Sequence, residues 1–159
     1  MKRFISGFDL TINRVLQFLS ICLLAVMTVV VFAQVVFRIF HASIIWSEEL
    51  SIYAMVWCVF LGAALCCRKG TMIGLEIFRS ILPKKLQKAV ILLASICTVA
   101  FLLFLAYVGA QIVLQMWSQA TPILKWPMGA VYAAIPVGAF LMALNTIFST
   151  YETLEGLKS

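Results

Sequence analysis

The chain has 159 residues, of which 64% are hydrophobic and 11% are charged, and its mean hydropathy is +1.10. A soluble domain is about half apolar and about a quarter charged, so this composition excludes a chain surrounded by water. The formal net charge of +6 falls in short segments between apolar runs, which favours contact with anionic membrane lipids over binding of nucleic acid. An all-α integral membrane protein with one membrane domain over residues 1–159 is therefore predicted.

In chain order, we predict transmembrane helices at approximately residues 15–37, 49–68, 86–114 and 128–149. A helix needs about 20 apolar residues to cross the hydrocarbon. Lys2 and Arg3 precede the first stretch as in a signal peptide, but its apolar run exceeds a signal core of about 7–15 residues, so we expect an uncleaved anchor. The third charge-free stretch, residues 89–124, is too long for one upright crossing and too short for two, which predicts a tilted helix. Pro127 suits the first turn of the fourth helix, and Pro136 should kink it.

The basic residues predict the orientation. Ten of the twelve Lys and Arg residues lie in the N-terminal segment, the second connection and the C-terminal tail, whereas the other two connections hold only Arg38 and Lys125. Because cytoplasmic loops carry the excess of basic residues, both termini are expected in the cytoplasm. The second connection and its flanks supply the expected contacts with lipid headgroups, which are Arg68, Lys69, Arg79, Lys84, Lys85 and Lys88.

Two cytoplasmic segments have the pattern of amphipathic interfacial helices, at approximately residues 2–13 and 72–82. In the first, Phe4 and Phe8 recur at helical spacing beside basic residues. In the second, Leu75 and Phe78 face away from Arg79. Helices of this kind lie in the plane of the headgroups. The alternative is a loop with incidental apolar residues.

No span contains an ionisable residue in its interior, which argues against an autonomous pathway for protons or ions. His41 is the only histidine and cannot supply a bis-histidine haem. The five cysteines lie within or at the ends of apolar runs and suggest packing residues. Glycine-rich phosphate loops and metal-ligand spacings are missing from the sequence. We therefore expect no enzymatic site, no cofactor and no metal site.

Charged and aromatic residues gather near the predicted outer interface. Glu48 and Glu49 follow Ser47 at the start of the second span, where a helix dipole favours carboxylates and serine is a good N-cap. Alternatively, one carboxylate pairs with Arg38 or contacts a partner, and we expect Arg38, Glu48 and Glu49 to lie close together. An aromatic belt at this interface is predicted from Trp46, Trp117 and Trp126.

Helix packing or a partner interface is expected at two further sets of residues. Gln111, Gln115 and Gln119 recur at four-residue spacing and would share one helix face, which should meet protein or headgroups. Small residues let transmembrane helices approach closely, and the last span carries a stripe of them. That stripe and the candidate contacts of the second span are Ala130, Ala134, Gly138, Trp57 and Gly62.

At the second span the sequence becomes specific. Four segments there, and others near the fourth span, carry the pattern: Trp46–Leu50, Tyr53–Trp57, Phe60–Ala64, Arg68–Gly70, Thr121–Pro122, Pro127–Gly129, Tyr132 and Ile135–Gly138. With the four-span layout, they resemble the small membrane (Q) subunit of tripartite ATP-independent periplasmic (TRAP) transporters, the DctQ-like family. That family often has a His-Ile pair and an aspartate after the glycine, whereas this chain has Met72-Ile73 and Glu76, so we assign no role to Met72.

The resemblance implies an accessory scaffold subunit in the bacterial inner membrane. In such transporters the small subunit forms a heterodimer with a large membrane subunit that holds the substrate and sodium sites. A periplasmic substrate-binding protein captures an organic acid such as a C4-dicarboxylate or sialic acid. Two other classes of membrane protein are alternatives. A self-sufficient four-helix multidrug-type exporter acting as a homodimer needs a membrane-embedded carboxylate, and Glu49 lies near the interface. A membrane enzyme or electron-transfer anchor would need histidines, a metal motif or outward cysteines.

The predicted orientation can be tested by labelling single cysteines in a variant without the native ones. Cysteines at His41 and Lys125 should react with a membrane-impermeant reagent added to the periplasmic side, and cysteines at Lys84 and Ser159 should not. The reason is the ten-to-two distribution of basic residues across the connections. Labelling of the cysteine at Lys84 from the periplasm would overturn the arrangement.

Overall fold

A computed structural model describes residues 2–40, 44–69 and 84–156 of the chain, and within these residues every regular element is helical. Four helices are long and apolar enough to cross a membrane, which confirms the predicted all-α membrane fold. In chain order the elements are α1 (Lys2–Ile39), α2 (Ile45–Lys69), α4 (Lys84–Met116), α5 (Met128–Tyr132) and α6 (Ala134–Gly156). The predicted interfacial helix at residues 72–82, with Arg79, lies outside the described residues.

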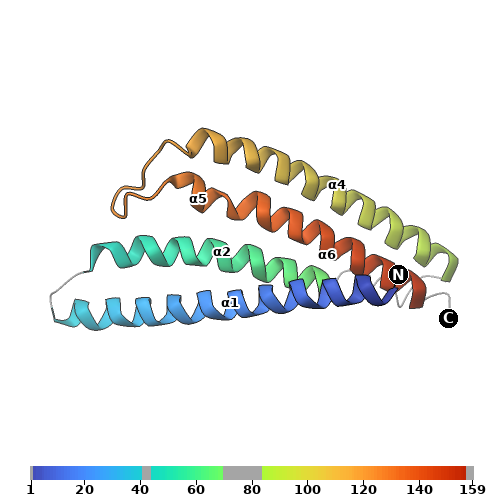
Figure 1. The fold of residues 1–159 in the computed structure, drawn as a ribbon, viewed down its shortest axis with the longest axis horizontal. Coiled ribbons are helices and arrows are strands. Elements are labelled where there is room, and N and C mark those ends of the chain that lie inside the picture. Colours follow the sequence, from blue (N-terminus) through green and yellow to red (C-terminus); the bar gives the residue numbers. More distant parts are fainter. Residues whose placement is uncertain (1, 41–43, 70–83, 157–159) are drawn as a thin grey trace.

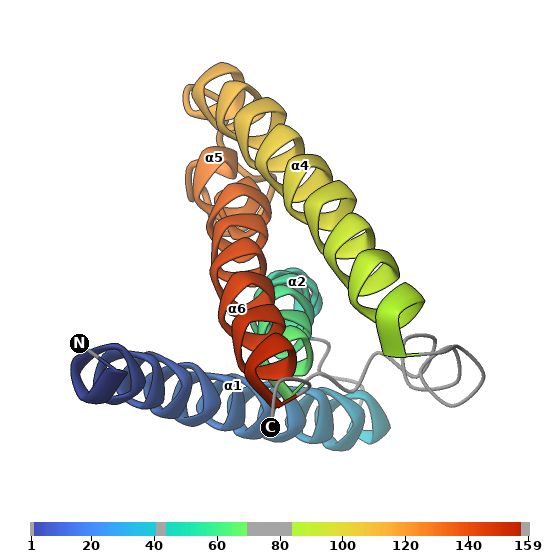
Figure 2. The ribbon, with the colours of Figure 1, turned by 90° about the vertical axis from the view of Figure 1, so that its right-hand side faces the viewer.

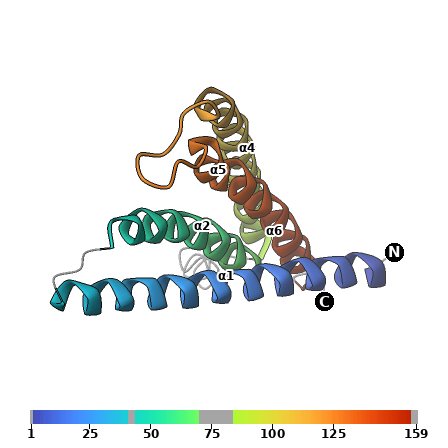
Figure 3. The same cartoon turned by 60° about the vertical axis from the view of Figure 1, so that its left-hand side comes forward.

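The long helices form an open, curved layer in the order α1, α2, α6, α4 (Figures 1 and 3). Successive spans run in opposite directions, and the start of α1 and the end of α6 lie at the same end of the layer (Figure 1). We call this the terminal end, and we call the opposite end, which carries the α4–α5 connection, the loop end. Among the described helices α1 packs along α2 and does not contact α4, so α1 and α4 form the two flanks of the layer. Hardly any side chains of α1 are buried against the rest of the chain.

The N-terminal segment differs from the prediction, because residues 2–13 are not a separate interfacial helix. They continue into the first span as one unbroken helix of 38 residues, about 57 Å long. No proline occurs between Lys2 and Ile39 to remove a backbone hydrogen bond, and helix propagation is cooperative. A single glycine, Gly7, costs only about 1 kcal/mol in a helix and does not end it.

The last span is broken where a kink was predicted. Pro127 has an extended backbone and precedes α5, which ends at Tyr132, and α6 begins at Ala134. Pro136 has no amide hydrogen to donate to Tyr132, and its ring would clash with that carbonyl in a regular helix. The amides of Ala133 and Val137 keep their helical bonds to Gly129 and Ala133, so the interruption is local.

Close approach at small residues holds neighbouring helices together. Ala134 is fully buried, and a Cβ added to Gly138 would lie 2.7 Å from Phe60 Cβ on α2. Gly109 on α4 allows a similar approach to Pro136. The predicted small-residue stripe therefore packs within the chain, with Ala130 only half-buried. In hydrocarbon such contacts drive association, because lipid tails are as apolar as leucine.

A buried polar contact links three helices near the terminal end. Asn145 on α6 is 2% exposed, and its side-chain amide donates to the Ala64 carbonyl on α2 at 2.7 Å. The side chains of Asn145 and Asn13 on α1 also exchange hydrogen bonds of 3.1 and 3.3 Å. Because an unpaired amide is expensive in hydrocarbon, this contact fixes the relative register of α1, α2 and α6.

The two glycines Gly138 and Gly62 offer a matched test of this packing. Alanine favours helix over glycine by about 1 kcal/mol, so Gly62→Ala, whose added Cβ has nothing within 4 Å, should stabilise the protein slightly. Gly138→Ala should instead destabilise it, because the new methyl group would overlap Phe60. Thermal unfolding of both purified variants in detergent measures the difference. Equal midpoints would show that α2 and α6 do not approach as the structure has them.

Candidate functional site

The loop end is organised around a buried carboxylate on α2. Glu49 is 8% exposed, and its Oε2 accepts hydrogen bonds from the amides of Ile123 at 3.1 Å and Leu124 at 3.0 Å. Its Oε1 accepts a hydrogen bond from the Tyr53 hydroxyl, one helical turn further along α2. Three donors and the positive end of the α2 dipole therefore surround the carboxylate, which explains how a charge is tolerated there.

The α4–α5 connection is folded so that it can provide these amides. The Thr121 amide donates to the Trp126 carbonyl at 2.8 Å, and the Trp126 amide donates to Thr121 Oγ1 at 3.1 Å. Lys125 has a left-handed φ of 57°, which reverses the chain between them. Thr121 itself is fully buried. We call this arrangement, Glu49 and Tyr53 with residues 121–126, the Glu49 latch, since it ties the start of α2 to the connection between α4 and α5.

The predicted proximity of Arg38, Glu48 and Glu49 stays a prediction, but the expected pairing with Arg38 is not seen among the described residues. Arg38 and Glu48 are exposed, and within the described part of the chain no ion pair joins Arg38 to either carboxylate. The oxygens of Glu49 are directed to the latch amides instead. Ser47 is not an N-cap either, because α2 begins at Ile45 and the buried Ser47 hydroxyl donates to the Ile44 carbonyl at 2.7 Å.

The predicted aromatic residues share the loop end, and each is about half exposed: Trp46 48%, Trp117 57% and Trp126 50%. Their placement is compatible with an aromatic belt, which stays a prediction. Trp57 is half-buried in the middle of α2.

Gln111 and Gln115 lie exposed on α4, but the third glutamine of the predicted stripe is not on the helix. Because α4 ends at Met116, Gln119 falls in the connection, where its carbonyl accepts a hydrogen bond from the Met128 amide at 2.8 Å. Gln119 therefore does not share a helix face with Gln111 and Gln115, because the four-residue spacing extends past the end of α4.

At the terminal end, Arg68, which was predicted to contact lipid headgroups, forms an ion pair within the chain. Arg68 donates two hydrogen bonds to the Glu152 carboxylate, of 2.7 and 2.6 Å, so this guanidinium joins α2 to α6 rather than reaching only headgroups. Lys88 is half-buried near the start of α4. The side chains of Lys69, Lys84 and Lys85 lie outside the described part of the structure.

Three important contacts were not foreseen from the sequence: Asn13 with Asn145, Glu49 with the connection, and Arg68 with Glu152. A lone amide inside an apolar span was the available signal for Asn145. Within the described residues, no group of three His, Cys, Asp or Glu side chains could hold a metal ion. These contacts join helices, because in each of them a polar group of one element is paired with a donor or acceptor of another.

Comparison with known proteins places these features in a family. Residues 27–156 match the family described as tripartite ATP-independent periplasmic transporters, DctQ component. The C4-dicarboxylate TRAP transporter small permease protein DctQ of Rhodobacter capsulatus is 35% identical over 105 residues, which cover 65% of this chain and 46% of that protein. A putative TRAP transporter small permease protein of Haemophilus influenzae is 28% identical over 139 residues, covering 87% of this chain and 84% of the relative. The sialic acid TRAP transporter permease protein SiaT of Haemophilus influenzae is 28% identical over 143 residues, covering 86% of this chain and 22% of SiaT.

The energetic role of the Glu49 latch is tested by comparing Glu49→Gln with Glu48→Gln. The first should lower the free energy of unfolding by about 1.5–3 kcal/mol, because it removes hydrogen bonds to a charged acceptor. The second removes an exposed carboxylate from the same helical turn and should cost no more than about 0.3–1 kcal/mol. Unfolding in detergent and proteolysis of the α4–α5 connection report both effects. If the two variants were equally stable, the dipole of α2 alone would account for Glu49.

Proposed function

Because this chain belongs to the DctQ family of tripartite ATP-independent periplasmic transporters, we propose that it is the small permease subunit that supports a large transport subunit in the bacterial inner membrane. Its relatives are named as transporter permease proteins rather than as enzymes. The function proposed is that of a scaffold, in which the substrate and the coupling sodium ion bind to the large subunit.

The observation that best supports the scaffold proposal is that the buried Glu49 carboxylate is hydrogen-bonded within the chain. Glu49 is the one buried charged side chain in the described part of the chain, and its carboxylate is already occupied by the amides of Ile123 and Leu124. A self-sufficient exporter of the multidrug type needs a membrane-embedded carboxylate that can bind and release a proton or a cationic substrate. The Glu49 carboxylate would have to leave the latch to do so. This counts against the alternative of a self-sufficient homodimeric exporter.

The open layer supports a heterodimer with a larger membrane protein. The flanking helices α1 and α4 expose many large apolar side chains, and α1 packs along α2 and touches α6 through the side chain of Asn13. A flank of this kind can accept another helix without disturbing the contacts inside the chain. SiaT, named as a permease protein, contains a region similar to most of this chain within a much longer polypeptide. That similarity supports a close association between the two kinds of subunit.

The loop end is the face that we propose to assist in docking a periplasmic substrate-binding protein. The Glu49 latch holds the α4–α5 connection in one conformation, and Pro122, Ile123 and Trp126 are exposed on it. A preorganised loop costs less conformational entropy on binding than a mobile one. The substrate is proposed to be an organic acid, since the relatives are named for C4-dicarboxylates and sialic acid.

Reconstitution tests the division of labour. Vesicles that contain this chain alone should take up no C4-dicarboxylate or sialic acid under a sodium gradient, even with a periplasmic binding protein added. Vesicles that also contain the large subunit should show uptake, and the large subunit without this chain is the control that measures what the scaffold contributes. Sodium-driven uptake by the purified chain alone would refute the proposal.

A further inference from the structure

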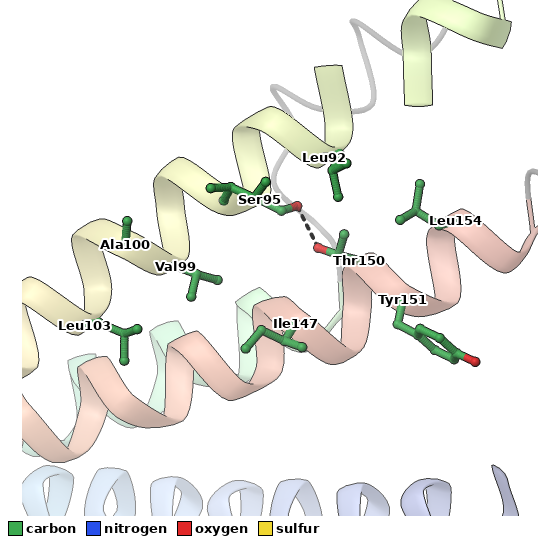
Figure 4. Close-up of a pocket in the computed structure, with 10 residues that line it drawn as sticks. Leu92, Ser95, Val99, Ala100, Leu103, Ile147, Thr150, Tyr151 and Leu154 are labelled. Atoms are coloured by element: carbon green, nitrogen blue, oxygen red, sulfur yellow. Dashed lines mark hydrogen bonds between the residues drawn. The ribbon is translucent and has the colours of Figure 1, made fainter. Parts of the chain in front are cut away.

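An apolar groove of about 490 Å³ lies between α4 and α6 in the terminal half of the layer (Figure 4). Side chains of Leu92, Val99 and Leu103 on α4 face Ile147 and Leu154 on α6 across it. The groove is open to the side, and several of its lining side chains are about half exposed.

The groove exists because α4 and α6 meet at the loop end and diverge towards the terminal end (Figure 2). Gly109 allows close approach to Ile135 and Pro136, and Leu102 packs with Ala139 in the small core between the helices. Beyond that core the two axes separate. The space is therefore a consequence of the crossing geometry and is framed by rigid helices.

Two polar side chains that face each other across the groove, Ser95 and Thr150, satisfy each other, whereas the ring of Tyr151, which also lines the groove, is directed away from them (Figure 4). The hydroxyl groups of Ser95 and Thr150 lie 2.7 Å apart across the groove, and Thr150 donates its proton to the Thr146 carbonyl at 2.7 Å. Ser95 must then be the donor to Thr150 Oγ1, so both hydroxyl protons are used. The hydroxyl groups of Ser95 and Thr150 are therefore satisfied by each other and by the Thr146 carbonyl, and the remaining lining is mainly aliphatic, which suits hydrocarbon.

A cation stands at the terminal end of this groove. Lys88 precedes Leu92 by one helical turn, and the stripe continues through Ile96 and Val99 at three- and four-residue spacing, so Lys88 shares the face of α4 that lines the groove. Lys88 is half-buried and has no ion-pair partner in the described part of the chain. Lys88 is the third residue of the apolar span Leu86–Met116, and a long basic side chain near the end of a span can reach the headgroup region.

We propose that the groove binds one anionic phospholipid of the cytoplasmic leaflet, with an acyl chain along the groove and the phosphate at Lys88. Residues 92–103 of α4 rise by about 16 Å along the groove, so its apolar lining forms a track of about that length. An extended acyl chain can lie along this track without leaving a polar group unpaired. Packing of its methylene groups against the apolar side chains would hold the acyl chain, and the charge of Lys88 would favour an anionic headgroup.

The proposal can be tested by mass spectrometry of the lipid that the protein retains. The full-length chain is placed in nanodiscs of equal phosphatidylglycerol and phosphatidylcholine and is then extracted into mild detergent. The wild type should keep one phospholipid, enriched in phosphatidylglycerol. Lys88→Gln should reduce that enrichment about fivefold, the equivalent of about 1 kcal/mol for one basic group near a membrane surface. Lys125→Gln removes a charge of the same sign at the loop end of the layer and should leave the enrichment unchanged.

A second experiment tests whether the lipid lies in the groove, by filling the groove with a larger side chain. Val99→Trp should abolish retention, whereas Phe101→Trp introduces the same side chain on the opposite, exposed face of α4 and should not. In the wild type, a phosphatidylglycerol with a photoreactive acyl chain should label peptides that contain Ile96, Val99 or Ile147, which avoids any dependence on a folded variant. Retention that survives Val99→Trp, labelling confined to α1, or loss of the lipid when the large subunit binds would each overturn the proposal.

Discussion

Polar groups buried in hydrocarbon must find their hydrogen-bond partners within the chain, and this constraint determines how the helices are joined. Asn145 meets it by binding the Ala64 carbonyl and Asn13, which lie on two other helices. Glu49 meets it at the opposite end by binding amides of the α4–α5 connection. Because each group would be costly if unpaired, the chain can adopt few other registers. The layer is therefore specified at both ends by a small number of polar contacts.

Between those ends, small residues decide which helices become neighbours. Gly138 brings α6 against Phe60 of α2, and Gly109 brings α4 against Pro136 at the break before α6. The contacts leave α6 and α2 in the middle and α1 and α4 at the flanks (Figure 2). Exposed apolar flanks of this extent would cause a water-soluble protein to aggregate. In a bilayer they cost little, and they remain available to lipid and to a second membrane subunit.

Local features of the fold could be predicted from the sequence, whereas most tertiary contacts could not. Apolar runs and charge distribution indicated the four spans, and the backbone chemistry of Pro136 indicated the break in the last one. The bonds of Asn145 to Asn13 and of Glu49 to Ile123 join residues 132 and 74 positions apart, and helical periodicity carries no information about such pairings. The amides that bind Glu49 could not be predicted for the same reason, since proximity of Arg38 in the sequence does not decide which donors reach this carboxylate.

The same contacts argue for a static subunit. Secondary transporters work by moving one group of helices against another around a fixed site. For α2 to move against α6 here, the Asn145 bond to Ala64 and the two hydrogen bonds between Arg68 and Glu152 would have to break together. Movement of α2 against the α4–α5 connection would also expose the Glu49 carboxylate. Each of these movements would leave polar groups without partners, which is costly in hydrocarbon. A subunit held in this way is suited to be the fixed support against which a partner moves.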